Sequence, residues 1–184
     1  KAQKATKLVK KKKKVPEELE PLTEIFIDIL SGKNKLMVHV HKEDDVMILL
    51  NLVNEFKIKT VTNHLCDVYN ESVFSMLRSF SIPIIYGPLD SFPYKVELKH
   101  ESWRNVEKLI KSKAKFALMS DHPVILQRNL FYGLRHLLRF GLSRSEAISK
   151  ITKEPAEIIE AGKLGHISPG YTASLTLWNG DPFL

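Results

Sequence analysis

The sequence has 184 residues, 43% of them hydrophobic, which is enough for one domain with a sizeable core. Its net charge of +7 comes from residues 1–14, which carry eight lysines and no acid, whereas the rest of the chain has 20 basic and 21 acidic residues. The single cysteine excludes an intramolecular disulfide framework, and no apolar run reaches the roughly 20 residues that a membrane span needs. We therefore expect a cytoplasmic protein without a secretory signal peptide.

Residues 1–15 are predicted to form a basic disordered arm. A lysine run of this kind could contact nucleic acid or an anionic membrane surface. A nucleic-acid-binding module, however, carries basic residues over its folded face, and the remainder of this chain is nearly neutral. We therefore expect a solvated arm and neither nucleic acid nor membrane as a partner.

The next segments alternate between helix and strand patterns. A helix is expected from Pro16 to Gly32, because acids fill its first turn and apolar residues recur at helical spacing. Its apolar stripe is Leu22, Ile25, Phe26, Ile29 and Leu30. Strands are then expected over 35–40, 58–65, 82–88 and 115–121, and helices over 43–56, 67–80, 102–113 and 124–141.

Four successive strand–helix units predict an α/β fold with a parallel sheet and right-handed crossovers. Four such units make half of an eight-stranded (β/α)8 TIM barrel. A further helix is expected over 143–159, with Ser143 as its N-cap and Glu146 completing a capping box. The alternating residues 173–178 predict a strand, and hence a small C-terminal β element.

Polar side chains follow three of the four predicted strands. His39 and His41 end the first strand, His64 ends the second, and Asp121 and His122 follow the fourth. Functional groups of parallel βα folds gather at this end of the sheet, and imidazole and carboxylate are the ligands that Zn²⁺ and similar cations take. The alternative is that each histidine is an ordinary hydrogen-bonded residue, but recurrence at three strand ends favours a metal site.

The other candidate groups carry less weight. Cys66 lies near His64 and could serve as a surrogate ligand, although a small buried thiol is the more usual role. His100, His136 and His166 lie away from the strand ends and are interpreted as surface or packing residues.

Three segments together resemble a known family. They are VHVHKEDDVMILLNLVNEFKIKTVTNH (38–64), FALMSDHPV (116–124) and the tail 142–183. These are similar to the C-terminal half of amidohydrolase-superfamily enzymes, in the imidazolonepropionase-like and prolidase-like branch. The tail carries the family pattern at Glu146-Ala147, Ile151-Thr152, Pro155-Ala156, Gly165, Ile167, Gly170, Leu175, Trp178 and Asp181-Pro182.

The resemblance implies a metal-dependent hydrolase of C–N bonds, either amide or cyclic amide, acting on a small-molecule substrate. It assigns His39 and His64 as metal ligands at the fifth and sixth barrel strands. It assigns Asp121, at the eighth strand, as both a metal ligand and the catalytic proton acceptor. His41 and His122 would contact substrate or support the ligands, and the metal would be zinc or, alternatively, iron.

The resemblance also divides the chain. Residues 16–142 would form the C-terminal half of the barrel, and residues 143–184 would form helices and part of a small β-sandwich domain. The family's first-strand His-x-His and its fourth-strand lysine or glutamate have no counterpart in the sequence. We therefore expect a fragment that is inactive alone and needs the missing N-terminal half or another copy of itself, as a homo-oligomer.

Two other functions fit the sequence. One is a non-catalytic binding or structural domain derived from an amidohydrolase half-barrel. The other is an α/β domain that binds nucleic acid through the lysine arm. Stoichiometric metal that is lost when His64 is replaced would favour the enzyme, and salt-dependent binding to DNA or RNA would favour the last.

Overall fold

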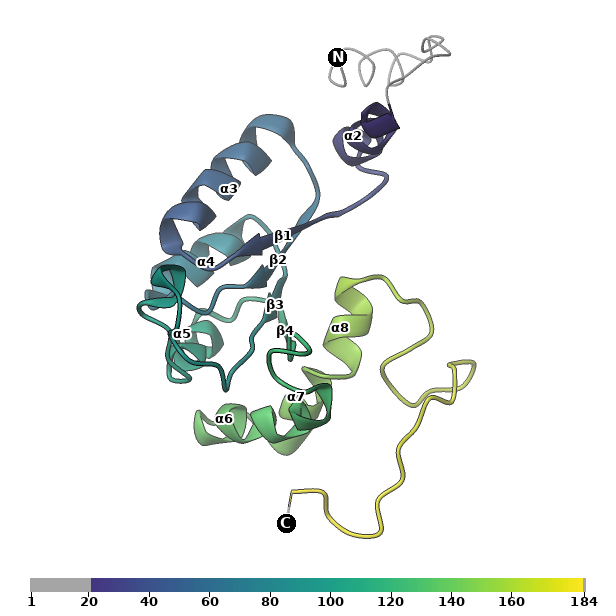
Figure 1. Ribbon diagram of the computed structural model, residues 1–184. Helices are drawn as coiled ribbons and strands as arrows, with labels where there is room; N and C mark the ends of the chain where they lie inside the picture. Colours follow the sequence, from purple (N-terminus) through teal and green to yellow (C-terminus); the bar gives the residue numbers. More distant parts are fainter. Residues whose placement is uncertain (1–20, 184) are drawn as a thin grey trace.

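A four-stranded parallel sheet forms the centre of the molecule (Figure 1). The computed structural model describes residues 21–183, so the predicted basic arm lies outside the described residues. The strands follow one another across the sheet in chain order. They are β1 (Leu36–Val40), β2 (Thr60–His64), β3 (Ile84–Tyr86) and β4 (Phe116–Leu118). The predicted α/β class and parallel sheet are confirmed.

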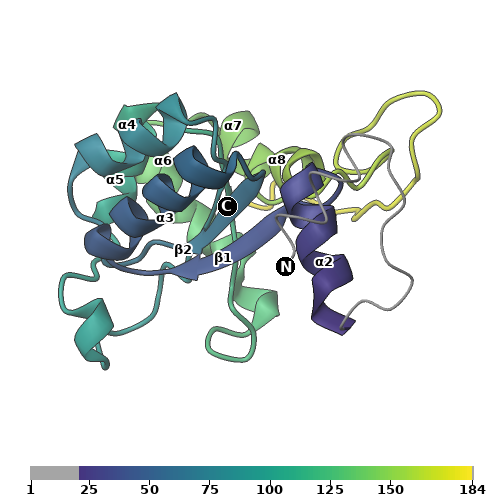
Figure 2. The ribbon, with the colours of Figure 1, turned by 90° about the horizontal axis from the view of Figure 1, so that it is seen from above.

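Helices connect the strands and cover one face of the sheet, as Figures 1 and 2 show. α3 begins with three acidic residues, which favour a helix N-terminus. It ends at Lys57, whose left-handed backbone lets its N–H donate to the carbonyl of Val53. The connecting helices are α3 (Glu43–Phe56), α4 (Glu71–Ser79) and α5 (Asn105–Ser112), and the 3-10 turn η1 (Val96–Leu98) lies between β3 and α5.

The main hydrophobic core lies between this helical layer and the sheet. Phe74 and Leu77 of α4 are fully buried there, against Ile84 and Tyr86 of β3. A second, smaller cluster on the opposite face joins Val61, Ala117 and Ile158. Ile158 belongs to α8 (Lys153–Ile158), so a helix from the end of the chain covers part of the other face of the sheet.

The opposite face is not covered uniformly. Met37 of β1 is the register partner of Val61 of β2, so the two side chains lie on the same face. Val61 is 1% exposed beneath α8, whereas Met37 is 49% exposed. The Lys35 ammonium reaches α8 by donating to the carbonyl of Ile158 at 3.0 Å and pairing with Glu160. The sheet is thus closed by α8 over β2 to β4 and open at β1.

The first helix exposes much of its apolar stripe. The described part is α2 (Pro21–Ser31), and the first predicted turn falls outside the described residues. Leu22, Ile25 and Phe26 are 66%, 53% and 53% exposed. Helical spacing predicts which residues share a face but not what covers that face. Here the first three residues of the stripe are uncovered, whereas Ile29 and Leu30 are partly buried.

Two predicted helices are broken. The segment 124–141 forms two 3-10 turns before α6, consistent with the weak helix propensity of Asn129 and Gly133. The segment 143–159 divides between Ser149 and Lys153, which leaves Pro155 in the first turn of α8, where its missing N–H is tolerated; a continuous helix would need that N–H. The elements are η2 (Gln127–Asn129), η3 (Phe131–Gly133), α6 (Leu134–Arg139), α7 (Arg144–Ser149) and α8. The capping box of Ser143 and Glu146 is confirmed.

The predicted strand over 173–178 is not formed among the described residues. Leu175, Leu177 and Trp178 are 58%, 94% and 56% exposed, and the tail loops away from the body (Figure 1) before the rings of Trp178 and Phe183 return to that of Phe131. A strand needs a neighbour to accept and donate its backbone hydrogen bonds, and residues 21–183 provide none beside this segment. The domain boundaries at 16–142 and 143–184 therefore stay predictions.

No helix within residues 21–183 is both long enough and apolar enough to cross a bilayer.

Candidate metal centre

Three histidines meet at the carboxyl edge of β1 and β2. We call His39, His41 and His64 the histidine cluster. Their ring centroids lie 4.8 Å apart for His39–His41, 4.1 Å for His39–His64 and 4.6 Å for His41–His64. Each ring offers one nitrogen, and these nitrogens all lie within 4.8 Å of one another. The parallel register, which pairs Val40 with His64, brings the two strand ends together.

The ring of His64 is held in one orientation. Its Nδ1 lies 2.9 Å from the carbonyl oxygen of Gly87. Because a carbonyl can only accept, Nδ1 carries the proton and Nε2 keeps its lone pair. The backbone of His64 is left-handed, with φ of 76°, which turns the side chain at the point where β2 ends. This is the arrangement in which a histidine presents Nε2 to a metal.

Two of the three histidines, His41 and His64, favour the neutral imidazole. Burial, followed by the charges of His64 and His39, lowers the pKa of His41 from 6.5 to about 4. Burial, followed by the charge of His39, also lowers the pKa of His64, although the Gly87 hydrogen bond and the charge of Asp121 oppose this. Near neutral pH both rings are therefore uncharged, which is the form that binds metal ions.

These residues fit a divalent metal ion. Nδ1 of His41 is buried and has no hydrogen-bond partner among the described residues. An unpaired buried ring nitrogen is costly, and coordination would satisfy it. A tetrahedral zinc ion with Zn–N bonds of about 2.0–2.1 Å separates its nitrogen ligands by roughly 3.3 Å. Small side-chain movements would bring the three nitrogens from 4.8 Å or less to that spacing.

Asp121 and His122 follow β4 but are not members of this group. Asp121 is partly buried, has a left-handed backbone with φ of 52°, and its negative charge raises the pKa of His64. His122 is exposed, and its Nδ1 accepts a hydrogen bond from the backbone N–H of Gln127 at 3.4 Å. The structure therefore joins His39, His41 and His64, and leaves Asp121 nearby and His122 on the loop.

The other histidines and the cysteine have separate environments. Cys66 is 2% exposed, its thiol donates weakly to the carbonyl of Pro88, and burial raises its pKa. His100 hydrogen-bonds to Asp67, and His136 donates to Asp90. None of these side chains joins the histidine cluster.

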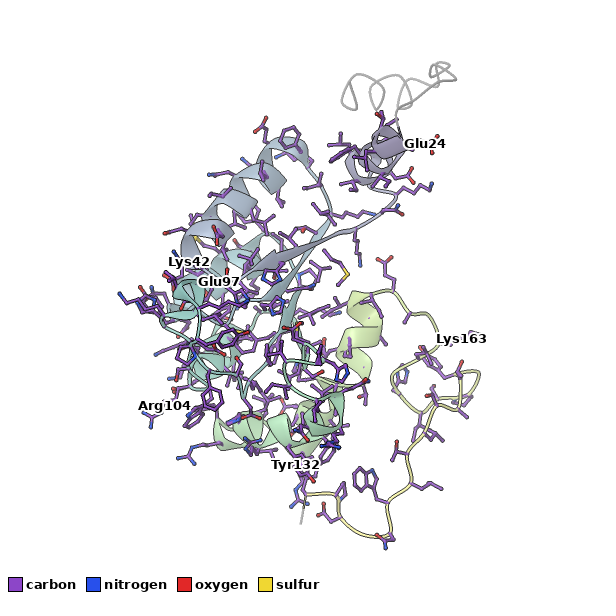
Figure 3. The ribbon with its side chains drawn as sticks, in the orientation of Figure 1. Glu24, Lys42, Glu97, Arg104, Tyr132 and Lys163 are labelled. Carbon is purple, nitrogen blue, oxygen red and sulfur yellow. The ribbon has the colours of Figure 1, made fainter. Side chains whose placement is uncertain are left out.

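A charged loop approaches the cluster from the third strand. Glu97, labelled in Figure 3, lies in η1 between β3 and α5. Its negative charge raises the pKa of His41, and the positive charge of Lys95 lowers it. The sequence pattern did not single out these residues, because nothing in their spacing shows that the loop returns to the end of β1.

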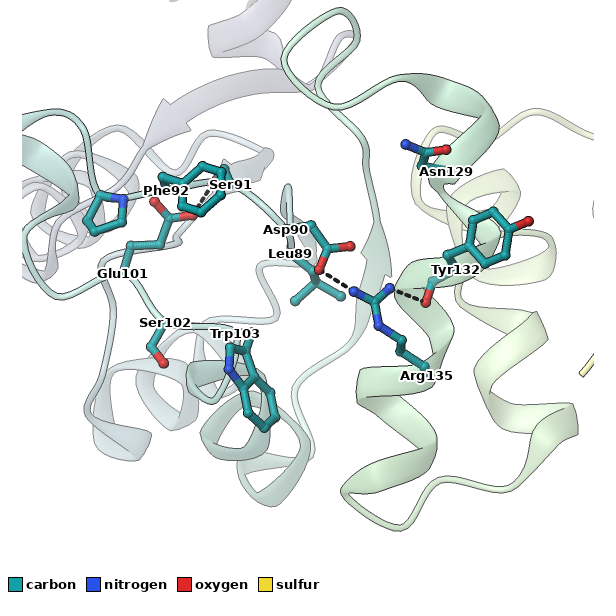
Figure 4. A pocket seen from close by; sticks show the side chains of 11 residues that line it. Leu89, Asp90, Ser91, Phe92, Glu101, Ser102, Trp103, Asn129, Tyr132 and Arg135 are labelled. Atoms are coloured by element: carbon teal, nitrogen blue, oxygen red, sulfur yellow. Dashed lines mark hydrogen bonds and ion pairs between the residues drawn. The ribbon is translucent and has the colours of Figure 1, made fainter.

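A separate cavity of about 660 Å³ lies between the loop after β3 and the α6 region (Figure 4). Asp90 anchors it, accepting hydrogen bonds from Arg135 at 2.7 Å and His136 at 2.9 Å. Trp103, also in its wall, stacks on His136 with ring centroids 5.2 Å apart. No member of the histidine cluster lines this cavity, and no sequence motif marks the residues that do.

The comparisons with known proteins place the chain in a family. The profile of the Amidohydrolase family matches residues 5–183. The chain belongs to the amidohydrolase family. An amidohydrolase from Thermotoga maritima MSB8 has a similar structure, with a TM-score of 0.85 and 30% sequence identity over 98% of this chain and 49% of that one. The amidohydrolase resemblance and the partial-barrel fold predicted from the sequence are thus confirmed.

A second structural comparison supports the fold alone. An uncharacterized metal-dependent hydrolase from Pyrococcus furiosus matches with a TM-score of 0.61 and 13% identity, over 94% of this chain and 35% of that one. No curated protein matches the sequence significantly. The chain spans about half the length of the Thermotoga amidohydrolase.

Proposed function

We propose that this chain provides the metal-binding part of a hydrolase that cleaves C–N bonds in amides or cyclic amides. The observation that carries the proposal is the histidine cluster, in which three imidazoles converge at the carboxyl edge of a parallel sheet. Functional groups of (β/α)8 folds lie at this edge. Membership of the amidohydrolase family supports the reaction class.

Zinc is the proposed ion, with His39 and His64 as ligands and His41 as the third imidazole beside them. Three neutral histidines form a usual catalytic zinc donor set that keeps one position open. A bound ion supplies Lewis-acid chemistry, which lowers the pKa of an attacking water and polarises the scissile carbonyl. Coordination by Asp121 stays a prediction.

Asp121 is the proposed proton-transfer group. Its carboxylate lies close enough to the histidine cluster for its charge to act on His64. Asp121 would accept a proton from the attacking water and then donate it to the leaving nitrogen, as a general base followed by a general acid. His122, on the exposed loop after Asp121, is proposed to contact the substrate.

Hydrolysis is proposed to need a second body of protein. β1 and β4 are the two outer strands of the described sheet, and the face beside β1 is open at Met37. Unpaired strand edges are templates for pairing with further strands. The additional strands would come from the other half of an amidohydrolase barrel or from another copy of this chain, in an oligomer.

Zinc titration of the full chain tests the metal proposal. After treatment with a chelator, the protein should bind one zinc ion with a calorimetric signal. His64→Ala should weaken binding by roughly 100-fold or more, because it removes a ligand. His166→Ala is the matched control, since His166 is exposed, its ring lies against that of Tyr171, and it is not a member of the histidine cluster. Equal zinc affinity in all three proteins would refute the proposal.

Hydrolysis assays test the reaction class. With the other half of the barrel or a second copy present, N-acyl and cyclic amide compounds should be cleaved only when zinc is bound, and Asp121→Asn should abolish cleavage while leaving the fold intact. If a second copy completes the site, the rate per chain should rise with chain concentration. Zinc binding without hydrolysis at any concentration or with the complementary half would instead support a non-catalytic binding domain.

A further inference from the structure

Asn63 occupies a special position beside the histidine cluster. It precedes His64 on β2 and is the register partner of His39 on β1. Partners on neighbouring parallel strands, about 4.8 Å apart, project to the same face of the sheet. The Asn63 amide therefore lies on the face that carries the His39 ring.

The oxygen of this amide is unsatisfied. Oδ1 of Asn63 is buried, and it accepts no hydrogen bond among the described residues. Only two other buried side-chain atoms in residues 21–183 share this condition, and one of them is Nδ1 of His41. Buried acceptors are normally paired, so an unpaired one beside a group of potential ligands calls for a functional explanation.

The ring of His39 lacks the support that His64 has. Nδ1 of His64 donates to the carbonyl of Gly87. No hydrogen bond joins either ring nitrogen of His39 to another group in the described part of the chain. A metal-bound histidine almost always donates its second ring N–H to an acceptor, which fixes the ring and raises its basicity. His39 therefore needs an acceptor, and Asn63 has an unused one next to it.

We propose that Asn63 is a positioning residue for the metal centre. Its Oδ1 accepts a hydrogen bond from the non-coordinating ring N–H of His39 when the histidine cluster binds an ion. The inference rests on the proposed metal centre and adds to it the residue that orients the first ligand. It also gives a role to an amide side chain on a largely buried strand.

Two substitutions at Asn63 test this role against a purely structural one. Asn63→Leu is similar in size and removes the acceptor, whereas Asn63→Asp keeps an oxygen at the same place. Zinc affinity, measured by competition with a chromogenic chelator, should fall about 10–100-fold in Asn63→Leu. It should equal or exceed the wild-type value in Asn63→Asp. Asn51→Leu, on the exposed surface of α3, is the control and should bind zinc normally.

Stability without metal gives the second readout. In excess chelator, Asn63→Leu should unfold at the same or a higher urea concentration than wild type, because it removes a buried unpaired oxygen. Reduced zinc affinity together with undiminished metal-free stability is the expected signature. Equal affinities of Asn63→Leu and wild type, or equally weakened binding in Asn63→Asp and Asn63→Leu, would overturn the inference. Failure of wild type to bind zinc would instead refute the proposed function.

Discussion

Replacement of Gly87 by alanine tests how the residue that follows β3 positions His64 in the histidine cluster. Gly87 has φ of +137°, a backbone conformation that residues with a side chain rarely adopt. A Cβ there would overlap the carbonyl oxygen of Met119 and lie 3.3 Å from Met119 Cγ. The Gly87 carbonyl also accepts the Nδ1 proton of His64 at 2.9 Å. One added methyl group therefore strains the backbone of residue 87, crowds Met119 and disturbs the orientation of His64, a proposed metal ligand.

The expected loss of stability is the sum of three contributions. The strained backbone costs about 1–3 kcal/mol, overpacking against Met119 about 1–3 kcal/mol, and the lost hydrogen bond to His64 about 1 kcal/mol. The total is about 3–7 kcal/mol, a large fraction of the roughly 5–15 kcal/mol by which a typical domain is stable. Zinc affinity of the folded fraction should fall about 10–100-fold, because His64 loses its acceptor.

Urea denaturation followed by circular dichroism measures the stability, and chelator competition measures the zinc affinity. Gly141→Ala is the matched control, because Gly141 also has a positive φ, +92°, but no atom within 4 Å of the added Cβ. It should cost about 1–2 kcal/mol through backbone strain alone and leave zinc binding unchanged. If the two variants lose the same stability and bind zinc equally, then neither the contact with Met119 nor the hydrogen bond to His64 matters at residue 87, and the prediction is wrong.

Three further predictions concern residues outside the histidine cluster. Ser143→Ala removes the capping box of α7 and should lower the free energy of unfolding by about 1 kcal/mol in urea denaturation, whereas Ser143→Thr should lose less. The buried Cys66 thiol, with its raised pKa, should react with iodoacetamide far more slowly in the folded protein than in urea, and equal rates would contradict its burial. Burial raises the pKa of Asp90, but His136 and Arg135 outweigh this and hold it below its ordinary value of 3.8. The ionised Asp90 therefore stabilises the fold above about pH 4, and this stabilisation is lost as the pH falls through the lower folded-state pKa. Between about pH 5 and pH 3, the free energy of unfolding should depend less on pH in Asp90→Asn than in wild type.

Local periodicity was sufficient to predict the sheet and the helical layer. Apolar runs bounded by turn residues marked the four strands, and strand–helix alternation fixed their parallel arrangement. The rule that functional groups follow parallel strands brought His39, His41 and His64 to the same edge, where the structure has them. These features depend on residues close together in the sequence, and therefore single-sequence reasoning could reach them.

Features that depend on distant contacts could not be predicted. Nothing in residues 173–178 shows whether a partner strand lies beside them, and the alternating pattern alone gave a strand that the structure does not form. The unpaired oxygen of Asn63 appears only once the β1–β2 register is known. The approach of Glu97 to His41 depends on the path of a loop. Asp121 was correctly predicted to follow the fourth strand, but the group of potential ligands that the structure brings together consists of the three histidines alone.

The packing of α8 against the sheet limits how small molecules reach the histidines. Ile158 packs on Val61 and Ala117 on the face of the sheet opposite the helical layer. This apolar cluster excludes small molecules from that face at β2 to β4. Within residues 21–183, the flank at Met37, which is 49% exposed, is uncovered, and His39 is exposed at the carboxyl edge of the sheet. A further body of protein packed against that flank would therefore cover this side and leave the carboxyl edge of the sheet as the route by which small molecules reach the histidines.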